Sequence, residues 1–285
     1  MANSIRLTIK SMYKDFTPKE QMIADYILKD PKKVGQSTIT DISNDLKIAD
    51  STFFRFTKKI GFLGFKEFKT ALLTSEENIT TASAIHQNIH PDDDELEIAQ
   101  KIFNSNISTL IDTKNLLSLE NLKKAINYID KSKRLFFFGV GGSQIVASDA
   151  YHKFLRSSIS VVHSADYHIQ LMETSLMTNE DCAILISHTG RSKETIQLAK
   201  AAKNNGAPII VVTSQIQSPL AKLADVVFIS ISEETTFRSE ALASRISQLS
   251  ILDAIYTNLM FRNQEQSQKS ISKIREVINV IKEQN

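Results

Sequence analysis

Apolar runs alternate with helix-patterned stretches through the second half of the chain. Five short segments rich in valine, isoleucine, leucine and phenylalanine predict strands buried on both faces of a parallel sheet. These segments are Leu135–Phe138, Ile159–His163, Ala183–Ile186, Ala207–Thr213 and Val226–Ser230. Helical patterns lie between them, as at Gln144–Leu155 and Lys193–Asn205. The alternation predicts a doubly wound α/β fold with a five-stranded parallel sheet.

Residues 1–77 carry only helical patterns and predict a separate all-α domain. Thr17 is placed to cap a helix, because proline follows it and Glu20 completes a capping box. A short helix is expected near Thr40–Leu46, and after a three-residue turn another helix begins at about Asp50 or Ser51 and ends at Ile60. Two short helices joined in this way predict a helix-turn-helix unit, whose second helix reads DNA.

A polar segment without periodicity, Glu76–Asp94, separates the two patterns and predicts a linker. We therefore expect a helix-turn-helix domain at 1–77, a linker at 78–94 and an α/β domain at 95–285, with its core at about 121–260. Apolar residues recur at helical spacing in Ala241–Met260 and Ser270–Lys282, and these two helices are expected to pair subunits. His86 and His90 in the linker have helical spacing, but two histidines without further ligands predict no metal site.

The overall charge says little about partners, since 34 basic and 32 acidic residues leave a net charge of +2. The local charge is more informative: five basic residues and one acid lie between Thr52 and Lys69. This excess predicts a surface for the DNA backbone, and the alternative is a solvated helix face. The candidate DNA-binding residues are Ser51, Thr52, Arg55, Lys58, Lys59 and Lys66.

The single cysteine, Cys182, lies within an apolar strand pattern, so a disulfide framework is excluded. Neither a membrane-length apolar run nor a secretory leader pattern is present. These observations predict a cytoplasmic protein.

Two loops with hydroxyl groups or glycines follow predicted strands and precede predicted helices. One is Gly139-Val140-Gly141-Gly142-Ser143, and the other is Ser187-His188-Thr189-Gly190-Arg191-Ser192. Helix N-termini attract anions, and hydroxyl groups add donors, so both loops suit a phosphate. The alternative for the second loop is a plain helix cap made by Thr189 or Ser192. A dinucleotide is disfavoured, because Gln144 stands where the third glycine of that motif belongs, and no cofactor is expected.

Residues from about Asn121 to Met260, with these two loops and the later run Ser218–Asp225, resemble a SIS (sugar isomerase) domain. The resemblance implies that Ser143, Ser187, Thr189 and Ser192 bind the phosphate and nearby sugar hydroxyls. His188 and Arg191 either touch the anion or face solvent. Glu240, Ser244 and Arg245 resemble the segment of SIS domains that reaches a partner's pocket. The candidate phosphosugar-binding residues are Gly141, Gly142, Ser143, Ser187, His188, Thr189, Gly190, Ser192 and Glu240.

The run Ser51–Phe68 resembles the recognition-helix region of the RpiR family of bacterial transcriptional regulators, which joins such a module to a SIS domain. One departure is Ala49, which stands where the family usually has a capping serine, and Asp50 is expected to supply the cap instead.

Together these features predict a DNA-binding regulator of carbohydrate metabolism genes that is controlled by a phosphosugar. The expected partners are double-stranded operator DNA, as an inverted repeat, and a second or further copies of the chain in a homodimer or homotetramer. The rival hypothesis is a phosphosugar isomerase or lyase, which needs a general base in the same pocket. His152, His188, Glu194 and Glu240 are the candidate bases.

Overall fold

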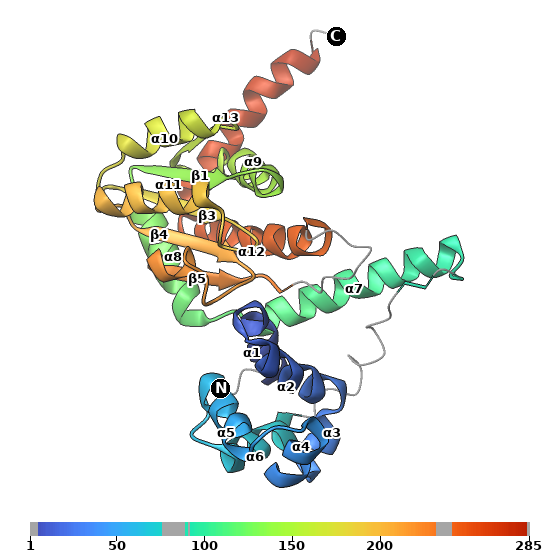
Figure 1. Cartoon of the computed structure of the whole chain (residues 1–285). Coiled ribbons are helices and arrows are strands. Elements are labelled where there is room, and N and C mark those ends of the chain that lie inside the picture. The colour runs from blue at the N-terminus through green and yellow to red at the C-terminus, as the bar shows by residue number, and fades with distance from the viewer. Residues whose placement is uncertain (1–4, 76–88, 91, 232–240, 284–285) are drawn as a thin grey trace. The chain divides into compact units, whose positions relative to one another are not determined.

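A computed structural model describes residues 5–75, 89–90, 92–231 and 241–283 of the chain (Figure 1). The chain divides into two compact units, Met1–Leu116 and Leu117–Asn285. We call them the helical unit and the sheet unit. Helix α7 (Glu95–Asn115) is expected from the sequence to follow the linker and belong to the second domain, whereas its contacts group it with the first unit.

The described residues of the helical unit form helices and no strand, as their sequence pattern predicts. The helices are α1 (Ile5–Met12), η1 (Tyr13–Asp15), α2 (Pro18–Lys29), α3 (Pro31–Gln36), α4 (Ile39–Leu46), α5 (Asp50–Lys59), α6 (Phe65–Ser75) and α7 (Glu95–Asn115). The predicted capping box is present at the start of α2, where the Thr17 side chain accepts from the N–H of Glu20. The fully buried Phe53, Phe56 and Phe68 are part of one core with Ile9, Ile23 and other apolar side chains.

Helices α4 and α5 form the predicted helix-turn-helix unit, with a turn of three residues between them. Lys47 adopts a positive φ of 52° in this turn. The expected cap by Asp50 is wrong: Ala49 occupies the N-cap position without a side-chain hydrogen bond, and Asp50 is the first helical residue. The carboxylate of Asp50 instead accepts from the Thr40 hydroxyl at 3.1 Å, which links α5 to α4.

The sheet unit holds the five predicted strands in one parallel sheet of order β2-β1-β3-β4-β5. The strands are β1 (Arg134–Gly139), β2 (Ser160–His163), β3 (Asp181–Ile186), β4 (Ile209–Thr213) and β5 (Val226–Ile229). Every residue of β3 and β4 is buried, which explains the apolar runs Cys182–Ile186 and Ile209–Val212 within them. The doubly wound α/β prediction is confirmed.

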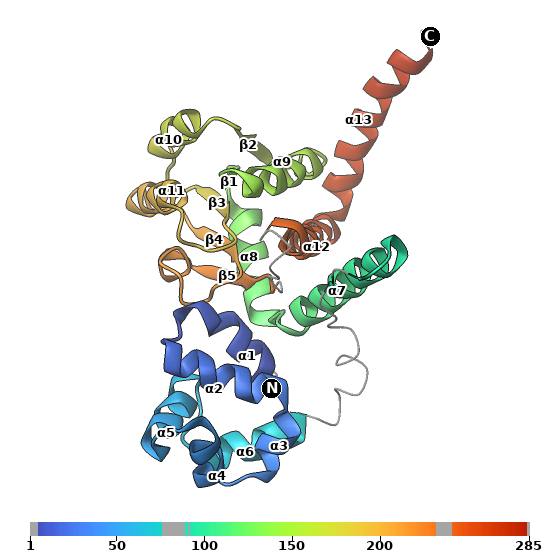
Figure 2. The ribbon, with the colours of Figure 1, turned by 45° about the vertical axis from the view of Figure 1, so that its right-hand side comes forward.

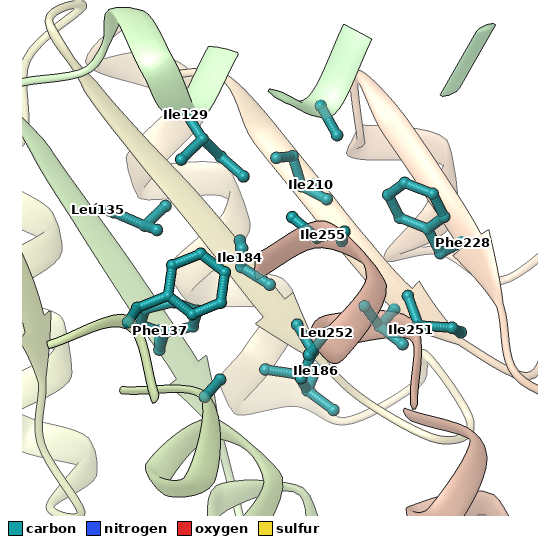
Figure 3. Close-up of a cluster of buried hydrophobic side chains, with 14 of the residues drawn as sticks. Ile129, Leu135, Phe137, Ile184, Ile186, Ile210, Phe228, Ile251, Leu252 and Ile255 are labelled. Carbon is teal, nitrogen blue, oxygen red and sulfur yellow. The ribbon is translucent and has the colours of Figure 1, made fainter. Parts of the chain in front are cut away.

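Helices cover both faces of the sheet (Figures 1 and 2). The helices of this unit are α8 (Leu119–Lys131), α9 (Gly142–Phe154), α10 (Tyr167–Ser175), α11 (Lys193–Asn204), η3 (Ala221–Leu223), α12 (Ala241–Arg262) and α13 (Gln264–Glu283). Of these, α13 extends away from the sheet (Figure 2). Residues of α8, α9 and α12 share one core cluster with one face of the strands, and residues of α10 and α11 pack on the other face. Figure 3 shows the first cluster, where Ile251 and Leu252 of α12 lie close to Ile186. Within the described ranges, no helix has the length and apolar character needed to cross a membrane.

An ion pair at the start of β1 ties two neighbouring strands together. The guanidinium of Arg134 donates to both carboxylate oxygens of Asp181, at 2.9 and 2.8 Å, and Asp181 is only 2% exposed. Burial raises the pKa of Asp181, but hydrogen bonds from Arg134 and Thr178 outweigh burial and hold it below its ordinary value. The charged form of Asp181 is therefore stabilised by folding.

We expect Arg134→Ala to lower the free energy of unfolding by about 3 kcal/mol, because it leaves a buried carboxylate without its cation. The adjacent Lys133 pairs with Glu180 on the surface, so Lys133→Ala is the matched control and should cost under about 1 kcal/mol. Since the pKa of folded Asp181 is lowered, its contribution exists above about pH 4 and fades as the pH falls further. Denaturation curves at neutral and acid pH should thus show the gap between wild type and Arg134→Ala closing in acid. A gap that widens in acid would contradict the assignment.

Candidate functional site

The order of the strands separates two loops at the carboxyl end of the sheet. Strand β1 lies between β2 and β3, and α9, which follows β1, packs on the opposite face from α11, which follows β3. The β1–α9 and β3–α11 loops therefore leave the sheet in opposite directions. Ligands of doubly wound folds bind at such a switch point.

The β1–α9 loop carries the glycines and the serine that the sequence analysis singles out. Gly141 has a positive φ of 59°, and no side chain caps the helix α9 that begins at Gly142. Ser143 lies in the first turn of α9 and is partly exposed. The N–H groups of Ser143 and Gln144 donate to the carbonyls of Val140 and Gly141, at 3.3 and 3.1 Å. The start of α9 therefore favours an anion chiefly through the positive end of the helix dipole.

The β3–α11 loop uses its hydroxyl groups partly to hold its own shape. The Ser187 hydroxyl accepts from the N–H of Gly190 at 3.2 Å, and the Thr189 hydroxyl accepts from Arg191 at 3.3 Å. Ser192 caps α11 by accepting from the N–H of Thr195 at 3.4 Å, and it donates to Glu194. Ser192 is thus a helix cap, as the alternative interpretation has it, and its proton goes to Glu194. The hydroxyls of Ser187 and Thr189 each accept one bond and still have a proton to donate.

A pocket of about 170 Å³ lies between the β1–α9 loop, His188 and helix α12. We call it the strand-end pocket, and it is lined by Val140, Gly142, Ser143, His188, Ser244, Arg245 and Gln248. Of the candidate phosphosugar-binding residues, the pocket brings together Gly142, Ser143 and His188. The remaining described candidates, Gly141, Ser187, Thr189, Gly190 and Ser192, belong to the two loops but do not line it. Glu240 lies outside the described residues.

Two of the lining residues, Val140 and Gln248, were not predicted from the sequence as site residues. Gln248 lies one helical turn after Ser244, so the spacing of four is a signal that places it on the same face of α12. His188 and Arg191, for which contact with the anion and exposure to solvent are the two alternatives, differ in position. His188 lines the pocket, while Arg191 is exposed and does not.

A chain of hydrogen bonds holds His188 from behind. The Nδ1 atom of His188 lies 2.7 Å from the hydroxyl of Ser214, which lies 3.3 Å from the hydroxyl of Ser230. The amide of Gln248 donates to Ser230 at 3.5 Å. The backbone carbonyl of His188 accepts from Ser214 and from the Thr213 hydroxyl, at 2.8 and 3.0 Å. His188 is therefore anchored to the end of β4, and the chain of hydrogen bonds continues to Gln248 on α12.

The candidate DNA-binding residues lie on α5 and at the start of α6. Ser51, Arg55, Lys58 and Lys66 are exposed, and Thr52 is half-buried. Lys58 lies over the ring of Phe54, 5.2 Å from its centroid. Lys59 differs from the others, because its ammonium donates to Glu20 at 2.7 Å and to the carbonyl of Asp15 at 3.2 Å.

Metal ligands do not gather in the described part of the chain, where no three His, Cys, Asp or Glu side chains form a possible site. His90 is described, and His86 falls outside the described residues. Cys182 is buried within β3, and burial raises the pKa of its thiol.

A helix-turn-helix unit and a parallel sheet with a polar strand-end pocket define a two-part regulator with a sugar isomerase type of domain. Comparisons with known proteins agree with this class. Residues 128–258 match the SIS domain, and residues 4–78 match the helix-turn-helix domain of the rpiR family. The chain belongs to the RpiR family of HTH-type transcriptional regulators.

Relatives match along nearly the whole chain. An uncharacterized HTH-type transcriptional regulator of Haemophilus influenzae is 36% identical over 97% of this chain and 96% of its own length. The HTH-type transcriptional regulator RpiR of Escherichia coli K12 is 27% identical over 92% of this chain and 88% of its own. Among solved structures, the Vibrio vulnificus NanR protein complexed with ManNAc-6P has a TM-score of 0.61 at 23% identity, covering 97% of this chain and 98% of that one. This last likeness shows that the fold is shared.

Proposed function

We propose that this regulator binds operator DNA with an affinity that is set by a phosphosugar held in the sheet unit. The observation that carries the proposal is the strand-end pocket, which joins Ser143 and the uncapped start of α9 to His188. Hydroxyl groups and a helix N-terminus together suit a phosphate. The NanR structure, which has this fold, contains a sugar phosphate, ManNAc-6P.

The phosphosugar would be held by residues from both loops and from the segment before α12. They are Gly141, Gly142, Ser143, Ser187, His188, Thr189, Gly190, Ser192 and Glu240. The two loops lie at the ends of neighbouring strands, β1 and β3, so one ligand of modest size spans them. A regulator of this kind acts on carbohydrate metabolism genes in the cytoplasm.

The DNA would contact the exposed face of α5 and the start of α6, through Ser51, Thr52, Arg55, Lys58, Lys59 and Lys66. A single helix-turn-helix unit makes few base contacts, so we infer a homodimer or homotetramer on an inverted repeat. Footprinting that shows a monomer on one unrepeated half-site would contradict this inference.

Arg55→Ala is expected to weaken DNA binding about tenfold to hundredfold and to reduce its salt dependence, because Arg55 is exposed on the proposed recognition helix. Lys59→Ala is the contrasting variant. Lys59 stabilises the helical unit through Glu20, so its removal should lower the melting temperature and weaken DNA binding less. Binding is measured by fluorescence anisotropy at several salt concentrations, on a fragment selected from random DNA by the wild-type protein. Equal DNA affinity in wild type and Arg55→Ala would remove α5 from the interface.

The proposal as a whole is tested by a panel of sugar phosphates and the matching sugars without phosphate. A ligand that binds the folded state raises its melting temperature, so a thermal-shift screen identifies binders. Those binders should then change the affinity for the selected DNA, while the neutral sugars should not. Steady conversion of any panel member into an isomer at enzymatic rates would instead favour the isomerase hypothesis.

A further inference from the structure

Arg245 is a cation that lines the strand-end pocket. Among the described residues that line the pocket there is no aspartate and no glutamate. Among the residues that the structure describes, the side chain of Arg245 forms neither an ion pair nor a hydrogen bond. Two other arginines of the sheet unit form ion pairs: Arg262, also on α12, contacts Asp130 at 3.2 Å, and Arg134 contacts Asp181 at 2.8 Å.

The surroundings of Arg245 favour a negatively charged occupant. Arg245 is half-buried, so part of its hydration is lost, and an anion can replace that hydration. The pocket is also lined by Gly142 and Ser143 at the uncapped start of α9, which adds a second source of positive potential. A guanidinium donates two parallel hydrogen bonds to a phosphate, which an ammonium does not do.

Helix α12 holds Arg245 in place before any ligand arrives. Ser244 and Gln248, on either side of Arg245 in the sequence, are each 2% exposed, and the same helix packs its apolar side chains on the sheet (Figure 3). Gln248 also joins the hydrogen-bond chain that leads through Ser230 and Ser214 to His188. The helix that carries Arg245 and the loop that carries His188 are therefore linked by hydrogen bonds, and a preorganised site binds more tightly than one that must be ordered.

We propose that Arg245 binds the phosphate group of the ligand, and that the same chain supplies Arg245, Ser143 and His188 to one pocket. This inference rests on the proposed phosphosugar site and deepens it, because it names the cation that makes the pocket select phosphate esters over neutral sugars. The proposed ligand class is a phosphate monoester, and its phosphate lies between the guanidinium and the start of α9.

The test measures the binding of inorganic phosphate to the full-length protein in the absence of DNA, by calorimetry at constant ionic strength. Arg245→Gln is expected to weaken phosphate binding about tenfold to hundredfold. Lys200→Gln removes the same charge from an exposed position on α11 and is the matched control, which should bind phosphate as the wild type does. Arg245→Lys keeps the charge but loses the paired hydrogen bonds, so its affinity should lie between those of wild type and Arg245→Gln.

A second measurement separates binding from a structural role. The affinity of the wild type for phosphate should fall as potassium chloride is added, and this dependence should be weaker in Arg245→Gln but unchanged in Lys200→Gln. Equal phosphate affinity in wild type and folded Arg245→Gln would overturn the inference, as would a wild type that binds no phosphate. Unfolding of both Arg245 variants would show that the guanidinium has a structural partner and would also overturn it.

The two proposals fail in different ways. If phosphate binding depends on Arg245 but no sugar phosphate of the panel alters DNA affinity, the anion site stands and the proposed regulation is wrong. If sugar phosphates alter DNA affinity equally in wild type and Arg245→Gln, the regulation stands and the role of Arg245 is wrong.

Discussion

Replacement of both Ser143 and Ser187 by alanine should nearly silence the response of DNA binding to a sugar phosphate. Each change removes a hydroxyl proposed to bind a phosphate dianion, and such a hydrogen bond contributes roughly 1.5 to 3 kcal/mol. The single variants should therefore lose affinity about tenfold to hundredfold, and the double variant about a hundredfold to ten thousandfold if the effects add. DNA affinity without ligand should stay at the wild-type value, because both residues belong to the sheet unit.

The measurement is calorimetric titration of the most stabilising sugar phosphate of the panel, with and without DNA. Linkage requires that if the ligand weakens DNA binding by some factor, DNA weakens ligand binding by the same factor. Ser175→Ala, at the exposed end of α10, is the control for loss of a hydroxyl from the same unit. The Ser187 hydroxyl also accepts from the N–H of Gly190, so the melting temperature of Ser187→Ala must be compared with that of Ser143→Ala. Wild-type affinity in a folded double variant would place the phosphate elsewhere.

Gly190→Ala is expected to cost the sheet unit about 3 kcal/mol or more, and with it the response to ligand. Gly190 has a φ of 61°, which strains any residue with a Cβ atom by about 1 kcal/mol or more. The added Cβ would also lie 2.2 Å from the Ser218 hydroxyl and 2.5 Å from the Ser218 Cβ, so the loop must shift, at a further cost of about 1 to 3 kcal/mol.

Gly141 offers a matched comparison, because its φ of 59° is nearly the same while an added Cβ meets nothing within 4 Å. Gly141→Ala should therefore show the backbone strain alone. Ser218→Gly in the Gly190→Ala background removes the atoms that collide and should recover part of the lost stability. Thermal melts of the four proteins compare these effects, and equal losses in Gly190→Ala and Gly141→Ala would show that Ser218 adds nothing.

Local patterns in the sequence predict most of the architecture, for reasons visible in particular residues. All six residues of β3 are buried, so its apolar run is unbroken and could be recognised without alternation. Thr17 with Glu20, and Asp94 with Glu97, form capping boxes whose residues are neighbours in sequence. The cap of α5 was missed, because the Asp50 carboxylate contacts Thr40 of the preceding helix, a tertiary contact that local spacing does not encode.

The strand-end pocket was harder to predict, since its walls come from three distant segments. Ser143 and His188 follow strands that pair directly, and the rule for strand ends brings them together. Arg245 and Gln248 reach the same pocket only because α12 packs beside α9, and their periodicity alone indicates an ordinary amphipathic helix. The sequence also did not predict which hydroxyl groups of the β3–α11 loop cap the helix and which are left for a ligand. A serine before a helix is expected in both roles, and Ser192 is observed as the cap.

The hydrogen-bond chain from His188 to Gln248 has a consequence for how this regulator can evolve. Ser214, Ser230 and Gln248 are all buried, so the loss of any one leaves a neighbour with an unsatisfied polar atom. A new ligand preference gained at one of these positions is therefore selected together with a compensating change at the next. Across diverging relatives, we expect Ser230 and Gln248 to be exchanged as a pair, whereas the residue equivalent to Val140 drifts independently.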